Sequence, residues 1–221
     1  MSRDADALGR ERMLRTIRET FVRTAEETGL AAPGPGVERA MAAVPRDRFV
    51  PPELRTEAWD DAPLPIGHGA TISQPFIVAL MTTLAHVGPG TRALEVGTGC
   101  GYQAAVLAAL GAEVWSVEVV PELARDAAAR LQALGHHQIH VRAGNGHLGW
   151  PEHAPYDAIL VTAAAAAVPP ALLEQLAPGG RLVIPIGAPW RAQHLMLLSR
   201  EAGGGIRRRE VLAVAFVPMQ D

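Results

Sequence analysis

The fold of this chain is decided by the stretch Thr91-Arg-Ala-Leu-Glu-Val-Gly-Thr-Gly-Cys-Gly-Tyr-Gln-Ala-Ala-Val-Leu-Ala108. A short apolar run reaches Glu95, glycines follow at Gly97, Gly99 and Gly101, and an alanine-rich helical pattern begins at once. This order predicts a strand, a tight loop and a helix. Glycine at alternate positions lets the backbone adopt positive φ angles and lets a ligand approach closely, with the loop amides facing it. We therefore expect a small-ligand site here.

The spacing of the glycines narrows the class of ligand. A dinucleotide fingerprint requires G-x-G-x-x-G, and a Walker loop requires Gly-Lys-Ser/Thr, whereas this chain has G-x-G-x-G and no lysine. Glu95 precedes the glycines, and Glu118 closes the next apolar run. This pairing is typical of methyltransferases that use S-adenosylmethionine (SAM), and a carboxylate at Glu118 can accept both ribose hydroxyls. The alternative is a buried glycine turn without a ligand.

The composition fits a single domain with its own core. The chain has 221 residues, of which 48% are hydrophobic, and a formal net charge of −3, which argues against a nucleic-acid partner. Its one cysteine, Cys100, excludes an intramolecular disulfide. The sequence contains no apolar run of membrane-spanning length and does not begin like a signal peptide. We expect a cytoplasmic protein without membrane contact, and a monomer is the simplest state.

After the glycine loop, apolar strand patterns alternate with helical patterns, which predicts a doubly wound, mainly parallel sheet of the Rossmann-like type. We expect strands near 113–119, 138–141, 156–162 and 181–186, and helices over 121–134 and 169–176. A Pro-Gly-Gly turn is expected before the last of these strands. Residues 193–199 and 207–217 have no helix between them, so a hairpin at one sheet edge is predicted.

The part of the chain before the core has a different pattern. Helices are expected over 8–28, ended by Gly29, and over 37–44. We expect one domain over 1–221, in which residues 1–75 form a helical cap and a substrate loop and residues 76–221 form the Rossmann-like core.

Residues 59–75 are rich in proline and glycine, which excludes a long helix or a central strand, and ordered loops of this kind often carry function. A helix is expected from Gln74 to Ala85 or His86, with Pro75 in its first turn. Ser73 would then occupy the N-cap position. Ser73 can therefore act as a helix cap, as a functional residue, or as both.

Other candidate chemistries are weaker. His136, His137 and His140 lack an acidic or cysteine partner at ligand spacing, so we interpret them as exposed turn residues and expect no metal. Cys100 has no base paired with it in the sequence and fills a tight turn. The G-x-S-x-G elbow of hydrolases is missing, which argues against Ser73 as a hydrolase nucleophile.

The sequence also limits the chemical class of the group that accepts the methyl. SAM enzymes that methylate base amines carry Asp/Asn-Pro-Pro-aromatic after the fourth strand, and this chain has Val161-Thr-Ala-Ala-Ala165 there. A carboxylate acceptor is already ionised near neutral pH, so it needs no general base. Catalysis then consists of in-line positioning and desolvation. The lack of a recognisable base fits carboxyl methylation.

Four segments together resemble the protein-L-isoaspartate O-methyltransferase family. They are Asp61-Ala-Pro-Leu-Pro-Ile-Gly-His-Gly-Ala-Thr-Ile-Ser-Gln-Pro75, Leu94-Glu-Val-Gly-Thr-Gly-Cys-Gly-Tyr-Gln-Ala-Ala-Val-Leu-Ala108, Tyr156-Asp-Ala-Ile-Leu-Val-Thr-Ala-Ala164 and Phe216-Val-Pro218. The glycine loop alone indicates only a SAM enzyme, whereas Thr-Ile-Ser-Gln-Pro is specific to this family. The resemblance implies a class I SAM methyltransferase fold. It also implies methyl transfer to the α-carboxylate of L-isoaspartyl residues in damaged proteins, followed by succinimide formation and repair.

The resemblance also implies roles for individual residues. Ser73 matches the active-site serine, and Thr71 and Ile72 lie beside it against cofactor and substrate. Glu95, Gly97 and Gly99, in the loop that ends at Gly101, match the methionine end of the SAM site, and Glu118 matches the acid that binds the ribose.

The chain departs from the family pattern at one position. Where the family usually has Gly-Asp-Gly near the adenine, this chain has Gly144-Asn145-Gly146. An asparagine carbonyl can still accept a hydrogen bond from the adenine amine, so we keep Asn145 and Gly146 in the site and expect Asn145→Asp to tighten SAM binding.

Two alternatives to general repair stay open at this point. One is a dedicated enzyme that methylates an aspartate of a ribosomally made peptide. We consider it less favoured because such enzymes often carry extra C-terminal sequence. The other is a SAM-binding protein without catalysis.

Overall fold

The computed structural model, which describes residues 3–188 and 192–220, is built around a seven-stranded sheet of order β5-β4-β3-β6-β7-β8-β9. Its strands are β3 (Arg92–Val96), β4 (Glu113–Glu118), β5 (Ile139–Ala143), β6 (Tyr156–Val161), β7 (Leu176–Ile186), β8 (Gln193–Arg200) and β9 (Ile206–Val214). The strands β3 to β7 pair in parallel with one another, whereas β8 pairs antiparallel with β7 and with β9. This confirms the predicted mainly parallel sheet with an edge hairpin.

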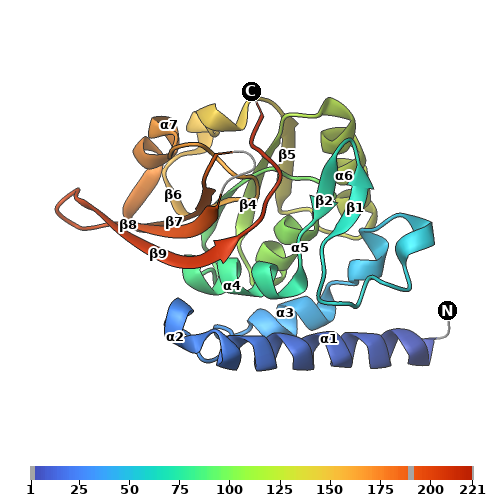
Figure 1. The fold of residues 1–221 in the computed structure, drawn as a ribbon. Coiled ribbons are helices and arrows are strands. Elements are labelled where there is room, and N and C mark those ends of the chain that lie inside the picture. Colours follow the sequence, from blue (N-terminus) through green and yellow to red (C-terminus); the bar gives the residue numbers. More distant parts are fainter. Residues whose placement is uncertain (1–2, 189–191, 221) are drawn as a thin grey trace.

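Alternate residues of the strands enter two different core clusters, because successive side chains of a strand point to opposite faces. In β3, Ala93 packs with helices on one face, and Leu94 packs with the cluster on the other. The helices between the strands are α5 (Tyr102–Ala109), α6 (Pro121–Ala133) and α7 (Pro170–Glu174). Figure 1 shows the resulting layers, with helices covering both faces of the sheet.

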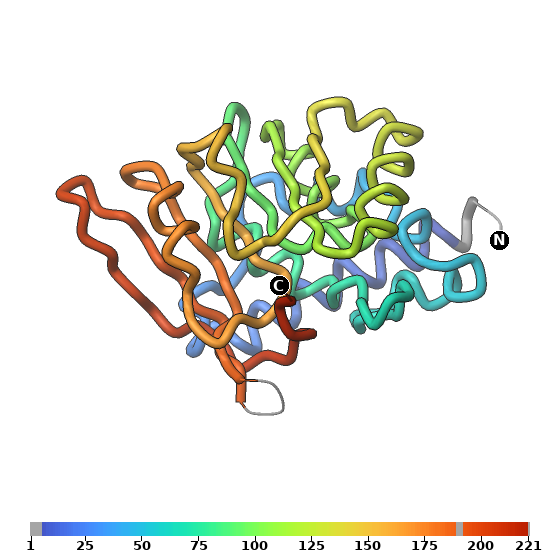
Figure 2. The backbone as a smooth tube through the Cα atoms, turned by 90° about the horizontal axis from the view of Figure 1, so that it is seen from above, coloured from blue at the N-terminus to red at the C-terminus, as the bar shows by residue number. Residues whose placement is uncertain are grey.

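The N-terminal helices complete one of these faces. They are α1 (Arg3–Arg23), α2 (Ala25–Thr28), α3 (Val37–Ala43) and, after the segment rich in proline and glycine, α4 (Pro75–Ala85). Buried Met13, Ile17 and Phe21 of α1 belong to the same cluster as α4 and α5, and the rings of Phe21 and Phe76 pack edge to face at 5.3 Å. The cap therefore shares its core with the sheet. Figure 2 shows the course of the N-terminal segment behind the strands in a view from above.

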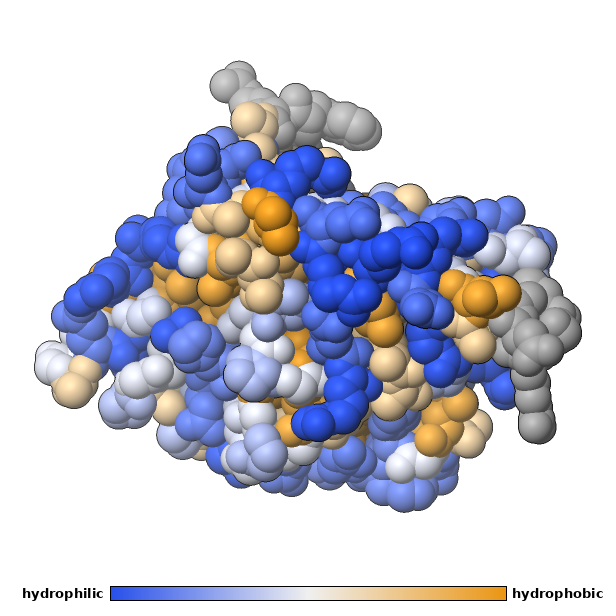
Figure 3. Space-filling view, turned by 90° about the horizontal axis from the view of Figure 1, so that it is seen from below, coloured by the Kyte–Doolittle hydropathy of each residue, from blue (hydrophilic) through white to orange (hydrophobic). Residues whose placement is uncertain are grey.

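The outer face of the molecule on the side of α1 carries both polar and apolar residues. Figure 3 views this side and shows hydrophilic residues interspersed with separate apolar groups. Leu8 and Val22, both on α1, are 69% and 67% exposed. None of the helices in the described part of the chain combines the length and the apolarity needed to span a bilayer.

The structure differs from the sequence prediction at two element boundaries. The single helix expected over 8–28 is divided at Thr24, although it ends at Gly29, whose φ of 71° forms the left-handed cap. The expected Pro-Gly-Gly turn lies inside β7, which begins at Leu176. A register irregularity between Tyr156 and Ala158 of β6 takes up the extra residues, so the strand continues through the turn sequence.

The prediction that Ser73 is the N-cap of the following helix is wrong. The cap position of α4 is Gln74, and neither side chain closes the first turn. Asp61 does so instead: its Oδ1 accepts a hydrogen bond from the Phe76 amide at 2.8 Å, and its Oδ2 accepts one from Gln74 Nε2 at 2.9 Å. A carboxylate reaching in from an earlier loop performs the capping, which leaves the Ser73 hydroxyl available.

Candidate active site

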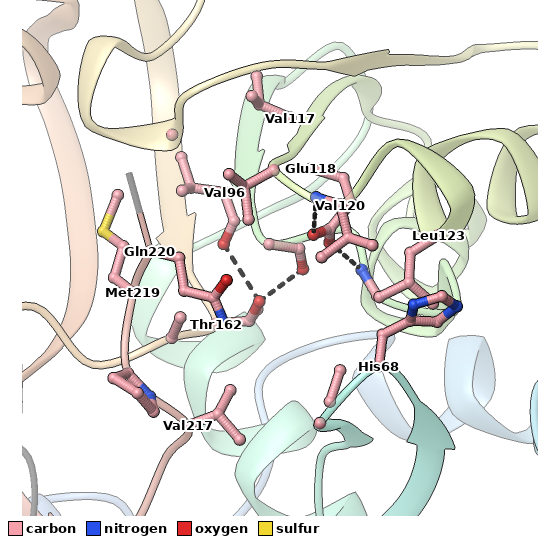
Figure 4. A pocket seen from close by; sticks show the side chains of 18 of the residues that line it. His68, Val96, Val117, Glu118, Val120, Leu123, Thr162, Val217, Met219 and Gln220 are labelled. Atoms are coloured by element: carbon pink, nitrogen blue, oxygen red, sulfur yellow. Dashed lines mark hydrogen bonds between the residues drawn. The ribbon is translucent and has the colours of Figure 1, made fainter.

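A pocket of about 260 Å³ lies at the carboxyl ends of β3, β4 and β6, and we call it the strand-end pocket. This is where ligands bind in open α/β sheets. Its walls are drawn in Figure 4 and come from six parts of the chain. These are residues 68–71, the end of β3 with the glycine loop (Val96, Gly97, Gly99), the end of β4 with the first part of α6 (Val117, Glu118, Val119, Val120, Leu123), Gly146, the two residues after β6 (Thr162, Ala163) and residues 217–220.

The hairpin that covers this pocket is formed by β1 (Leu64–Gly67) and β2 (Ala70–Ile72), which pair antiparallel outside the main sheet. The predicted lack of a long helix or central strand in residues 59–75 is therefore confirmed. His68 at the hairpin tip has a φ of 53°, a conformation that non-glycine residues rarely adopt. Its side chain lies beside Leu123 at the pocket mouth in Figure 4.

The glycine loop leaves no room for a side chain at its first position. Gly97 has a φ of 94°, and a Cβ added there would stand 2.5 Å from Thr162 Oγ1. Gly101 has a different role: it is the N-cap residue of α5 with a φ of 90°, and a Cβ there would meet the Leu131 side chain. Gly97 therefore shapes the pocket, whereas Gly101 lets the chain turn into the helix.

Glu118 lines the strand-end pocket and also holds the glycine loop. Its Oε2 accepts a hydrogen bond from the Gly99 amide at 2.8 Å, and its Oε1 accepts one from the Val120 amide at 3.1 Å. Figure 4 shows both bonds. Each carboxylate oxygen has a second lone pair, so the group can accept further hydrogen bonds from a ligand in the pocket.

Glu95 is fully buried and faces a small cavity of about 30 Å³ rather than the strand-end pocket. Its Oε2 accepts a hydrogen bond from Ser116 Oγ, which lies 2.6 Å from Thr98 Oγ1, while its Oε1 has no hydrogen-bond partner among the described residues. Burial raises the pKa of Glu95 to about 8, against the opposing effects of the Ser116 hydroxyl and the Ala104 amide.

A second and larger pocket, of about 560 Å³, lies on the other side of Thr71, and we call it the loop pocket. One wall contains Ser73 and the start of α4, and the opposite wall is the segment 212–217 from the end of β9 onward. The Ser73 hydroxyl makes no hydrogen bond within the part of the chain that the structure describes. A free hydroxyl at a pocket wall can donate to an anionic group bound there.

The two pockets share Thr71, Thr162 and Val217. Thr162 directly follows β6, and its Oγ1 donates to the carbonyl oxygens of Gly97 at 2.6 Å or Val96 at 3.1 Å. A ligand in the strand-end pocket and one in the loop pocket would therefore meet across the same side chains. This arrangement suits a direct transfer of a group between two bound molecules.

The structure brings together most of the residues that the sequence indicated. Thr71, Gly97, Gly99, Glu118 and Gly146 line the strand-end pocket, Ser73 lines the loop pocket, and Ile72 and Glu95 line the small cavity, which also contains Thr71 and Ser73. Asn145 and Gly101 line none of these three pockets. Asn145 Oδ1 accepts a hydrogen bond from the His147 amide at 2.8 Å and caps the turn Gly146–Leu148. The role of Asn145 near an adenine stays a prediction.

Sequence reasoning missed three contributors: Thr162, His68 and the C-terminal residues 217–220. Thr162 could have been found, because it comes directly after a predicted strand at the ligand-binding edge of the sheet. Phe216-Val-Pro218 contributed only to the family resemblance, and nothing in residues 217–220 indicates a ligand site. They reach the pocket through hydrogen bonds between the Ala164 amide and the Val217 carbonyl and between the Met219 amide and the Ala164 carbonyl, both 2.8 Å.

The remaining candidate chemistries find little support in the geometry. In residues 3–188 and 192–220, no group of three or more histidine, cysteine or acidic side chains is arranged to hold a metal ion. Burial raises the pKa of the Cys100 thiol to about 11, so it is not a thiolate nucleophile at neutral pH.

Comparison with known proteins identifies the same family that the sequence segments resemble. Residues 17–221 match the family model described as protein-L-isoaspartate(D-aspartate) O-methyltransferase. The chain belongs to this family. A protein-L-isoaspartate O-methyltransferase 2 from Syntrophobacter fumaroxidans is 51% identical over 98% of this chain and 87% of its own length. Another, from Polaromonas sp., is 52% identical over 94% of this chain and 98% of its own length.

A solved structure described as that of a putative protein-L-isoaspartate O-methyltransferase supports the fold. It comes from Plasmodium falciparum, contains S-adenosyl-L-homocysteine, and is 25% identical with a TM-score of 0.74 over 92% of this chain and 98% of its own length. The Rossmann-like, class I methyltransferase fold expected from the sequence is thereby confirmed.

The buried carboxyl of Glu95 leads to a prediction about stability and pH. Because the folded state raises its pKa from 4.5 to about 8, protonated Glu95 is favoured in the folded protein, and the free energy of unfolding falls as pH rises between these values. The effect is at most about 1.4 kcal/mol per pH unit, or roughly 4 °C in melting temperature for a chain of this size. Glu95→Gln should flatten the melting temperature measured by circular dichroism from about pH 5 to pH 8.

The matched control for this measurement is Glu174→Gln, which changes an exposed carboxylate on α7. This variant should keep the wild-type slope. Equal slopes for wild type and Glu95→Gln would show that Glu95 is not protonated in the folded protein.

Proposed function

We propose that this chain transfers the methyl group of SAM to the free α-carboxylate of an L-isoaspartyl residue, with the donor in the strand-end pocket and the carboxylate beside Ser73. The resulting ester leads to a succinimide and so begins repair of the damaged protein or peptide. The observation that carries the proposal is the meeting of two separate pockets at Thr71 and Thr162. Membership of the family supports the reaction class.

The residues of the strand-end pocket fit SAM. Gly97 and Gly146 line the pocket, and neither position has room for a side chain: an added Cβ at Gly146 would stand 2.4 Å from Val96 Cγ1 and one at Gly97 would collide with Thr162. Glu118 presents free carboxylate lone pairs for ribose hydroxyls, and Val117, Val120 and Leu123 supply apolar surface. SAM supplies an activated methyl group on a sulfonium. Gly97 and Gly99 would lie at its methionine end.

The acceptor side needs orientation more than proton transfer. An isoaspartyl α-carboxylate is ionised near neutral pH and carries its own nucleophilic lone pairs. The Ser73 hydroxyl would donate a hydrogen bond to one carboxylate oxygen and leave the other directed toward the strand-end pocket. Thr71 and Ile72 would hold this oxygen in line and exclude water, which is where the rate enhancement of such a reaction arises.

Replacement of Gly97 tests the donor site. Gly97→Ala places a methyl group against Thr162 and strains the left-handed backbone, so SAM affinity measured by calorimetry should fall about tenfold or more. Gly203→Ala is the control, because a Cβ there meets nothing within 4 Å. Unchanged affinity in Gly97→Ala would remove the glycine loop from the donor site.

The substrate is tested with a pair of isomeric peptides. We expect methyl transfer from radiolabelled SAM to a peptide that contains L-isoaspartate, giving a base-labile ester, and no transfer to the same peptide with ordinary aspartate. Equal labelling of both isomers would indicate an aspartate-methylating enzyme, and labelling of neither would contradict the proposal.

Replacement of Ser73 tests the acceptor site. A hydrogen bond to a charged group contributes about 1.5–3 kcal/mol, so Ser73→Ala should lower the turnover of the isoaspartyl peptide about 10–100-fold. SAM affinity should stay within about twofold of wild type, since Ser73 does not line the strand-end pocket. Ser199→Ala, in β8, should behave as wild type. A wild-type rate for Ser73→Ala would assign that serine no role in the reaction.

A further inference from the structure

An arginine lies completely buried behind the loop pocket. Arg46 opens the short turn Arg46–Arg48 and has an exposed fraction of 0%. Within the described residues it forms no ion pair with a carboxylate at contact distance. Burying a guanidinium in this way is costly unless its donors are matched by acceptors. The hydrogen-bond partners of Arg46 therefore indicate the role of this buried side chain.

All of the hydrogen bonds that the Arg46 guanidinium makes within the described residues go to backbone carbonyl oxygens of the loop 58–75. Nη1 donates to the Ala58 carbonyl oxygen. Nη2 donates to the carbonyl oxygens of Ala62 and Ser73, both at 3.0 Å. The three acceptors are separated by up to 15 positions in the chain, and Ser73 is the proposed acceptor-binding residue. One planar group thus ties the two ends of the loop to each other.

The same guanidinium also contacts the element that follows the glycine loop. Its central carbon lies 5.8 Å from the centre of the Tyr102 ring, at the first residue of α5. The Tyr102 ring is buried and packs edge to face against Phe49 at 5.4 Å. Arg46 therefore touches the helix that follows the glycine loop on one side and the segment that carries Ser73 on the other.

We propose that Arg46 is a positioning residue, which sets the distance between the Ser73 backbone and the start of α5 and thereby aligns the acceptor carboxylate with the methyl donor. The inference rests on the proposed function for its catalytic consequence. Arg46 lines neither the strand-end pocket nor the loop pocket, so it acts through Ser73 rather than on the reacting atoms. Displacement by about 1 Å can cost about 100-fold in rate.

The hydrogen bonds of Arg46 distinguish a positioning role from a role in core packing alone. A hydrophobic residue of similar volume would fill the space but leave the carbonyls of Ala58, Ala62 and Ser73 without their donor. A lysine would keep the charge, but its ammonium cannot reproduce the planar fork that reaches three separated carbonyls. Arg46→Lys is therefore the informative substitution.

The test is a double-mutant cycle of Arg46→Lys and Ser73→Ala. Arg46→Lys should lower kcat for the isoaspartyl peptide about 10–100-fold and leave SAM affinity within about threefold. In the Ser73→Ala background the same substitution should lower kcat less than about threefold, because both changes remove one positioning effect. The proposal would be overturned if Arg46→Lys lowered kcat by the same factor, within about twofold, whether Ser73 is present or replaced by alanine.

A stability-matched control excludes partial unfolding as the cause. Ile159→Val trims a fully buried side chain of β6 in the other core cluster, and it should lower the melting temperature without changing kcat. If Arg46→Lys does not fold, Arg46→Gln replaces it in the same cycle, because a neutral amide keeps two N–H donors and buries no charge.

Hydrogen exchange supplies a readout that needs no substrate. Amide exchange of residues 58–75, measured by mass spectrometry, should be faster in the Arg46 variant than in wild type and unchanged in Ile159→Val. Unchanged exchange in the Arg46 variant would overturn the positioning role. If the wild type methylates neither peptide isomer, the proposed function fails while the exchange measurement still decides whether Arg46 holds the loop.

Discussion

The hydrogen bond from Thr162 Oγ1 to the Gly97 carbonyl, at 2.6 Å, is the contact on which the rest of the site depends. It joins the end of β6 to the glycine loop after β3, two strands that are neighbours in the sheet. The contact is possible because position 97 has no side chain. It places one threonine between the strand-end pocket and the loop pocket, so the separation of donor and acceptor is set by the spacing of two parallel strands.

Charge is distributed unequally around this contact. Glu118 accepts two backbone hydrogen bonds and lines the pocket, whereas Glu95 is enclosed, has one unpartnered oxygen and has a raised pKa. These two acids, each near the end of a strand, thus differ in their surroundings. Glu118 combines support of the loop with contact to a ligand, and Glu95 belongs to a buried network with Ser116 and Thr98.

Much of the fold followed from local pattern, and the exceptions have physical causes. The alternation of strands and helices predicted the parallel sheet, and the missing helix after β8 predicted the edge hairpin. The position of Ser73 before Gln74 and Pro75 predicts an N-cap as one of its two possible roles, but a distant carboxylate, Asp61, supplies that cap. A cap provided from another segment leaves no mark in the local sequence. The same holds for Arg46, whose three acceptors are backbone atoms and therefore carry no residue signature.

The participation of residues 217–220 in the strand-end pocket has a consequence for biosynthesis. The Ala164 backbone bonds to Val217 and Met219, so this wall can form only after the ribosome has added both of these residues. The glycine loop is synthesised more than 100 residues earlier. A nascent chain therefore contains the loop long before residues 217–220 can close the pocket around it.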